Sequence, residues 1–204
     1  MILVGKAGSG KDTFAKMFPE LRRFAFADNV KKVVSMAQYY GNEATIDYII
    51  NRTGVYDSHM EELLAYAEYH QGDSIGKQRE LLQLIGDGFR NIEPDIWVDW
   101  LVSDIENAGN PPYIITDCRY ENEFERFKDD ISVYIEANAK IRKKRLRNYT
   151  EQFDDELLNH KSENEIDKFC EKCTYTVKNH INSLKMLRNH ADAIRKRISL
   201  PSET

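Results

Sequence analysis

Cysteine is scarce in this chain of 204 residues, which contains only Cys118, Cys170 and Cys173. The opening segment MILVGKAG carries no secretory signal pattern, so an odd set of three cysteines does not suggest a disulfide framework. Cys170 and Cys173 form a C-x-x-C pair, but a zinc site would need a second pair or two suitably spaced histidines, and the sequence provides neither. We therefore expect free structural thiols in a reducing, cytoplasmic environment.

Long apolar runs and an excess of positive charge are also missing. No segment approaches the roughly 20 apolar residues that a membrane-spanning helix needs, so no membrane association is expected. The net charge is −5, which argues against a protein built to coat nucleic acid. Hydrophobic residues make up 41% and charged residues 31%, a balance typical of a folded globular chain and not of a disordered one.

Predicted strands alternate with predicted helices along the chain. Apolar or β-branched segments predict strands at 1–4, 21–27, 110–119, 132–138 and 173–182. Helical patterns cover 12–18, 28–41, 77–90, 139–149 and 183–199, and residues 42–78 are polar and mostly helical. This alternation predicts an α/β fold with a parallel five-stranded sheet, helices on both faces, and ligands at the edge where the strands end.

Three details of the helices can be checked against a structure. Asp28 is expected to cap the helix over 28–41, which should end at Gly41. Leu81, Leu84 and Ile85 are expected to share one apolar face. A stripe of Trp97, Trp100 and Leu101 at helical spacing predicts core packing.

A glycine-rich loop, GKAGSGKDTF at 5–14, follows the first predicted strand. It fits the pattern G-x-x-x-x-G-K-[ST] at Gly5, Gly10 and Lys11, but Asp12 stands where the hydroxyl belongs and Thr13 follows. Glycines let backbone N–H groups surround a phosphate, and the following helix presents its positive N-terminal end. Because the loop lies between a strand and a helix, it predicts a nucleotide-phosphate site.

Asp117 and Arg119 lie at the end of the predicted strand in YIITDCRYENE. A carboxylate at this edge can hold Mg²⁺ directly or through water, and a guanidinium two residues later can bind a phosphate with its fork. The other interpretation is an ion pair that fixes the end of the strand. The preceding loop favours the functional interpretation.

Two further groups of polar residues are less specific. Arg79 and Gln83 lie one turn apart on a helix, with Arg90 beyond them, and could bind a phosphate and a base edge or simply form a solvated face. Six basic residues fall within 140–147. This basic helix is either a solvated anion patch or a lid that brings Arg142 and Arg145 over phosphates.

In their order along the chain, several segments resemble phage-type deoxynucleoside monophosphate kinases of the P-loop kinase family: GKAGSGKDT, FADNVKKV, RELLQLIGDGFR, ITDCRYENE and NHKSE. They resemble dephospho-CoA kinase and adenylate kinase more loosely. The resemblance spans nearly the whole chain and implies a three-layer P-loop NTPase fold over 1–204. It also implies a helical acceptor-binding insertion at 42–108 and a lid-like region at 140–165.

Carried over residue by residue, the resemblance implies a site for ATP and Mg²⁺. The residues implied for the ATP phosphates and metal are Gly8, Ser9, Gly10, Lys11, Asp12 and Thr13. Asn179 lies in the turn expected beside the adenine, and His160, Ser162 and Glu163 match an H-x-[ST]-E element near the lid. An acid after the loop lysine is a trait of the family, so Asp12 is expected to hold Mg²⁺ together with Asp117.

The resemblance also implies an acceptor site and a reaction. The expected acceptor-binding residues are Asp28, Lys31, Arg79, Gln83, Arg90 and Arg119, and the expected catalytic cations are Lys11, Arg119, Arg142 and Arg145. Asp28 departs from the deoxynucleotide group, where the position is often apolar or glycine; dephospho-CoA kinases place an acid close by as a base.

The expected activity is transfer of the ATP γ-phosphate to a deoxynucleoside monophosphate in the cytoplasm, the host's if the chain is phage-encoded. A dephospho-CoA or other small-metabolite kinase and a non-catalytic nucleotide-binding module remain alternatives. The sequence leaves open whether the chain acts alone or as a homodimer.

Overall fold

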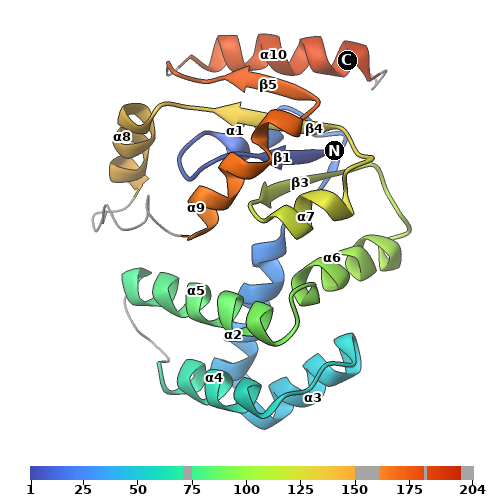
Figure 1. Cartoon of the computed structure of the whole chain (residues 1–204), viewed down its shortest axis with the longest axis vertical. Coiled ribbons are helices and arrows are strands. Elements are labelled where there is room, and N and C mark those ends of the chain that lie inside the picture. The colour runs from blue at the N-terminus through green and yellow to red at the C-terminus, as the bar shows by residue number, and fades with distance from the viewer. Residues whose placement is uncertain (71–74, 150–160, 182, 199–204) are drawn as a thin grey trace. The chain divides into compact units, whose positions relative to one another are not determined.

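In a computed structural model, the chain is described over residues 1–70, 75–149, 161–181 and 183–198, with only the backbone described at 75–77, 149, 161 and 162. It divides into two compact units (Figure 1). The first comprises Met1–Phe24 together with the chain from Asn110 onward, and the second is Ala25–Gly109. Within the described ranges, no helix is both long and apolar enough to cross a membrane.

The first unit contains a parallel sheet of five strands in the order β2-β3-β1-β4-β5. The strands are β1 (Ile2–Val4), β2 (Arg22–Phe24), β3 (Tyr113–Cys118), β4 (Ser132–Glu136) and β5 (Tyr175–Lys178). All five fall within the segments predicted as strands, and the predicted α/β fold with a parallel five-stranded sheet is confirmed. Because every strand runs in the same direction, the segments that follow them emerge at one edge.

Helices cover both faces of this sheet (Figure 1). They are α1 (Lys11–Ala15), α7 (Glu121–Arg126), α8 (Ala139–Tyr149), α9 (Lys161–Glu165) and α10 (Leu184–Arg197), with short 3₁₀ turns at Ile166–Lys168 and Cys170–Lys172. On one face, Phe14 of α1, Phe18 just after that helix and Leu187 of α10 join strand residues such as Leu3 and Val133 in one buried core. This packing fixes the first strand and the helix that follows it, and thereby the ends of the loop between them.

The second unit is a bundle of five helices: α2 (Phe26–Tyr40), α3 (Asn42–Thr53), α4 (Ser58–Tyr69), α5 (Ile75–Ile92) and α6 (Ile96–Asn107). Trp97 and Trp100, each 1% exposed, stack at the centre of its core, as the spacing predicted. The indole N–H of Trp97 donates to the carbonyl of Gly86 at 2.9 Å, which ties α6 to α5.

Two expectations about the helices were wrong. Asp28 does not cap α2, because the helix begins two residues earlier at Phe26 with Ala25 as its N-cap, which places Asp28 in the first turn. Leu84 is 43% exposed, whereas Leu81 and Ile85 are buried. At 100° per residue, the buried row through Leu81, Ile85 and Phe89 leaves Leu84 on the flank of the helix. The end of α2 at Gly41 is confirmed.

Candidate active site

Four segments of the first unit follow the carboxyl ends of parallel strands. The glycine-rich loop follows β1, Arg119 follows β3, α8 begins after β4, and Asn179 follows β5. Since β1 is the central strand and β3 and β4 are its neighbours, this order brings residues that are far apart in sequence around the loop. Ligands bind at this edge in parallel α/β sheets.

The loop uses a backbone conformation that only glycine adopts easily. Gly8 and Gly10 have φ values of 73° and 105°. A Cβ at Gly8 would lie 2.9 Å from the carbonyl oxygen of Arg142, and one at Gly10 would lie 2.5 Å from the Nδ2 atom of Asn179. The glycines are therefore required both by their φ angles and by the close packing of α8 and the turn after β5 against the loop.

Side chains from outside the loop bind its carbonyl oxygens. Arg145 Nη1 donates to the carbonyls of Gly8 at 3.2 Å and Ser9 at 2.9 Å, and Asn179 Nδ2 donates to Ser9 at 2.8 Å. Arg142 Nη1 donates to the carbonyl of Ala7 at 3.3 Å. Holding successive carbonyls in this way orients the peptide planes, so that N–H groups of the loop and of the first turn of α1 can face an anion.

Lys11, the first residue of α1, is 7% exposed. Its ammonium donates to the carbonyl of Gly5 and, at 3.3 Å, to that of Lys6. Burial lowers the pKa of this ammonium to about 8, and the nearby Arg119 acts in the same direction. Three carboxylates oppose the shift: Glu163, Asp12 and Asp117. A buried cation next to a loop of backbone donors is suited to binding phosphate.

Glu163 of α9 is 1% exposed and lies against the loop. Its two carboxylate oxygens accept the N–H of Ala7 at 2.9 and 3.0 Å. Arg142 Nη1 lies 3.0 Å from Oε2, and Arg119 Nη1 lies 3.5 Å from Oε1. The structure thus joins two of the predicted catalytic cations through one buried carboxylate. The sequence pointed to this residue only through the family resemblance.

Glu123 also supports the site and was missed in the sequence. Its side chain is 2% exposed, and Oε2 accepts the N–H of Arg119 at 2.8 Å and of Tyr120 at 3.1 Å. A Glu in the first turn of α7 that reaches back to the preceding N–H groups is half of a capping box. The spacing in RYENE could have revealed it, and its effect is to fix the backbone that carries Arg119.

Two carboxylates could contribute to a metal site beside the loop. Asp12 is exposed in the first turn of α1, and Asp117 is half-buried in β3. Both raise the pKa of Lys11, which places their charges close enough to act on its ammonium. No cluster of three or more His, Cys, Asp or Glu side chains that could hold a metal occurs in the described parts of the chain. Two carboxylates completed by water and phosphate oxygens suit Mg²⁺, which usually keeps several waters.

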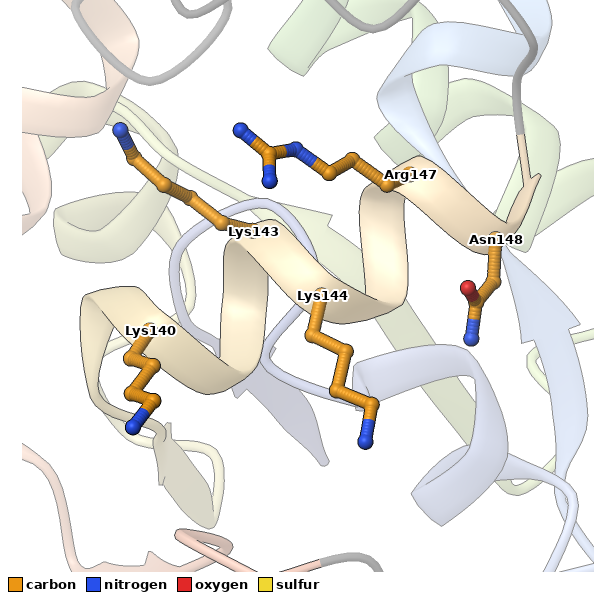
Figure 2. A pocket seen from close by; sticks show the side chains of 5 residues that line it. All are labelled: Lys140, Lys143, Lys144, Arg147 and Asn148. Carbon is orange, nitrogen blue, oxygen red and sulfur yellow. The ribbon is translucent and has the colours of Figure 1, made fainter.

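The basic helix α8 presents two sets of cations. Arg142 and Arg145 contact the loop. A hollow of about 340 Å³ is lined by four other cations of the helix, Lys140, Lys143, Lys144 and Arg147, together with Asn148. Figure 2 shows Lys143 and Arg147 pointing to one side and Lys140, Lys144 and Asn148 to the other.

Among the remaining predicted residues, Thr13 is half-buried in α1 of the first unit. The others lie in the second unit, except those outside the described residues. Asp28 and Lys31 are paired at 3.5 Å in the first half of α2, and Arg90 Nη1 lies 3.5 Å from Asp87 on α5. On the same helix Arg79 is exposed and Gln83 is half-buried. An acceptor role for these residues stays a prediction. His160 and the side chain of Ser162, which belong to the predicted lid-like region, lie outside the described residues.

All three cysteines are free thiols, as expected. Burial raises the pKa of Cys118 well above its usual value and that of Cys173 to about 12. The pKa of Cys170 is also raised, mainly by burial. The raised pKa values keep these thiols protonated at neutral pH, which makes them weak nucleophiles.

Two of the solved structures that resemble this chain cover nearly all of it at low sequence identity. TT1252 from Thermus thermophilus matches with a TM-score of 0.58 and 14% identity, over 98% of this chain and 97% of that chain. Dephospho-CoA kinase from Campylobacter jejuni matches with a TM-score of 0.48 and 13% identity, over 97% of this chain and 95% of that chain. No family model matches the chain, and no curated protein matches it.

At these identities the likeness to TT1252 concerns the fold alone, and the second TM-score is too low to carry an argument. The chain is therefore an α/β protein with a fold like that of TT1252.

Proposed function

We propose that this protein is an ATP-dependent kinase that transfers the γ-phosphate of ATP to a deoxynucleoside monophosphate, giving ADP and a deoxynucleoside diphosphate. The observation that carries the proposal is the loop between β1 and α1. Its carbonyls are bound by Arg142, Arg145 and Asn179, and its lysine is a buried ammonium. This arrangement suits the β- and γ-phosphates of a nucleotide.

Phosphoryl transfer depends mainly on alignment and on neutralising the charge that spreads over the transferred group. In our proposal Lys11 and Arg119 supply positive charge, with Arg142 and Arg145 beside the loop. Asp12 and Asp117 would hold Mg²⁺, which would supply positive charge that neutralises the phosphates. No general base is strictly required, because an acceptor phosphate oxygen is already a nucleophile.

The resemblance and the polar side chains of the second unit support this choice of acceptor. We propose that residues 42–108 form the acceptor-binding part, together with Lys31 of α2. Arg79 and Arg90 offer guanidinium groups for a phosphate, and Gln83 offers a donor and an acceptor for a base edge. Residues 140–165 are proposed as a lid-like region, and Asn179 as part of the adenine site.

Asp28 supports a second candidate, a dephospho-CoA kinase or other small-metabolite kinase. Its carboxylate is 46% exposed in the first turn of α2, so it is accessible as a base for a hydroxyl acceptor. A third candidate of another class is a non-catalytic nucleotide-binding module, which would use Lys11 but no acceptor.

One assay separates the three candidates: ADP release from ATP and Mg²⁺ with a panel of deoxynucleoside monophosphates, ribonucleoside monophosphates and dephospho-CoA. We expect turnover with at least one deoxynucleoside monophosphate and none without acceptor. Turnover with dephospho-CoA alone would replace the proposed acceptor. Nucleotide binding without turnover on any acceptor would favour the non-catalytic module.

A further inference from the structure

Glu163 is a buried carboxylate that has no role in the proposed reaction as described so far. Three segments meet at its oxygens: the loop after β1 through the Ala7 N–H, the end of β3 through Arg119, and α8 through Arg142. A carboxylate that is 1% exposed is costly unless its oxygens are fully bound, and here they accept a backbone N–H and face two guanidinium groups.

The contacts of Glu163 help to hold the side chains of Arg119 and Arg142 beside the loop. Each guanidinium presents Nη1 to the carboxylate. The rest of the Arg119 fork is thereby held in one orientation, and an arginine loses less entropy on binding a phosphate when its fork is already placed. The two carboxylate contacts to Ala7 also fix the entry of the loop relative to both arginines.

Two buried polar atoms beside the loop point to a ligand. Among the described residues, the Nε atom of Arg142 and the Oγ atom of Ser9 lack a hydrogen-bond partner, and the two residues are 8% and 1% exposed. Unpaired buried polar atoms are rare in folded proteins and call for a specific explanation. A bound anion at the loop would supply the missing partners.

Building on the kinase function proposed above, we propose that Glu163 is a positioning residue for the terminal phosphate of ATP. It holds Arg119 and Arg142 in the arrangement that recognises the γ-phosphate, and does not itself contact the nucleotide. Its loss should therefore affect a triphosphate more than a diphosphate, because the diphosphate lacks the group that these arginines recognise.

Calorimetric titration of Glu163→Gln with the Mg²⁺ complexes of β,γ-imido-ATP and of ADP tests this directly. Glutamine keeps an oxygen for the Ala7 N–H but lacks the charge that holds the guanidinium groups. We expect affinity for the triphosphate analogue to fall by about tenfold or more and affinity for ADP to fall by less than about threefold, given the strength of charge-assisted hydrogen bonds. Glu165→Gln is the matched control, because Glu165 lies on the same helix and pairs with Lys168.

A double-mutant cycle with Arg119→Ala separates positioning from general destabilisation. In the Arg119→Ala background, Glu163→Gln should change triphosphate affinity much less than in the wild type, because part of its effect acts through Arg119. If Glu163→Gln does not fold, Glu163→Asp keeps the charge with a shorter reach and should show the same preferential loss of triphosphate affinity. Equal losses for ATP analogue and ADP, or full additivity with Arg119→Ala, would overturn the inference.

The binding experiment does not depend on turnover. A wild-type protein that binds both nucleotides but phosphorylates no acceptor would contradict the proposed function, while the comparison of the two nucleotides would still test Glu163. Conversely, a wild-type kinase whose Glu163→Gln variant binds the triphosphate analogue normally would refute the role of Glu163 alone.

Discussion

Asp12 is the residue at which this loop departs from the usual pattern, in which a neutral hydroxyl touches Mg²⁺. A carboxylate beside a polyphosphate is unfavourable unless a cation stands between them. Asp12→Ala should therefore raise the Mg²⁺ concentration needed for the half-maximal rate, while metal-free nucleotide binding stays level or tightens. Asp12→Ser should recover much of the activity. The measurement is a Mg²⁺ titration of the rate at fixed ATP.

A suitable control for this titration is Asp129→Ala. Asp129 is an exposed acid that precedes β4, at the edge of the sheet opposite the loop. Its removal changes the net charge by the same amount but should leave the Mg²⁺ midpoint in place. If the midpoint of Asp12→Ala is also unchanged, Asp12 acts only on the first turn of α1 and the metal role is withdrawn.

At the scale of residues, the glycine motif predicted local structure more reliably than single polar residues such as Asp28 did. The glycine spacing predicted a strand, a loop and a helix, and these elements are present at the expected places. The partners of the loop could not be predicted, because Arg145 and Asn179 are over a hundred residues away in sequence and reach Ser9 only once the sheet has formed. Asp28 seemed a helix cap because the sequence does not show that the buried Phe26 already belongs to α2.

The helix α8 carries the loop-binding Arg142 and Arg145 and also lysines that line the hollow. Replacing Arg142 and Arg145 together by Ala should lower ATP affinity by about tenfold or more, because several charge-assisted hydrogen bonds to the loop and to Glu163 are lost. Replacing Lys140 and Lys144 together removes the same charge from the same helix. That control should bind ATP normally. Isothermal titration with the Mg²⁺ complex of β,γ-imido-ATP measures both.

Turnover measurements on the same two variants test the lid interpretation of α8. A loss confined to kcat in the Arg142/Arg145 variant, with normal nucleotide affinity, would mean that these cations act on the transition state after closure and not on the loop. Equal nucleotide affinity losses in both double variants would contradict a specific role for the two arginines and leave only a general effect of charge.

At the scale of elements, the alternation of apolar strands and amphipathic helices was sufficient to predict the sheet of the first unit. The segments predicted as strands contain all five strands, and the basic segment 139–149 is a helix with the expected bounds. Periodicity alone could not show which side of α8 faces the loop, since both sides are basic. The packing of Gly8 against Arg142 decides this.

The two units of the molecule carry different groups of predicted site residues. If the second unit binds the acceptor, Arg79→Ala and Gln83→Ala should raise the KM for the acceptor about tenfold or more, and Gln83→Ala should alter the order of preferred bases, because each removes a polar contact. ATP affinity should stay unchanged in both. Steady-state assays over the panel of acceptors provide the measurement.

Glu80→Ala is the control for this pair, because Glu80 is exposed between them on α5. Its kinetics should match the wild type for every acceptor. Wild-type KM values and base preferences in Arg79→Ala and Gln83→Ala would exclude α5 from the acceptor site. The two residues would then be interpreted as part of a solvated helix face.

For the whole chain, the fold class was predictable and the division into two units was not. The sequence suggested one domain with an insertion from residue 42, whereas the second compact unit begins at Ala25. Its core explains the difference: Val30, Val33 and Val34 of α2 pack with Trp97 and Trp100 of α6, far along the chain. Such contacts between distant segments are not visible in local periodicity.

The buried ammonium of Lys11 also has a consequence for the lifetime of the protein. A pKa lowered from 10.5 to about 8 corresponds to a cost of about 3 kcal/mol for keeping this lysine charged in the empty protein at neutral pH. That cost is fully present below pH 8 and disappears as the pH rises toward 10.5, because the folded chain loses its proton first. An anion on the loop would offset it at neutral pH, so the nucleotide-loaded chain should unfold less often and resist proteases longer when nucleotide is abundant.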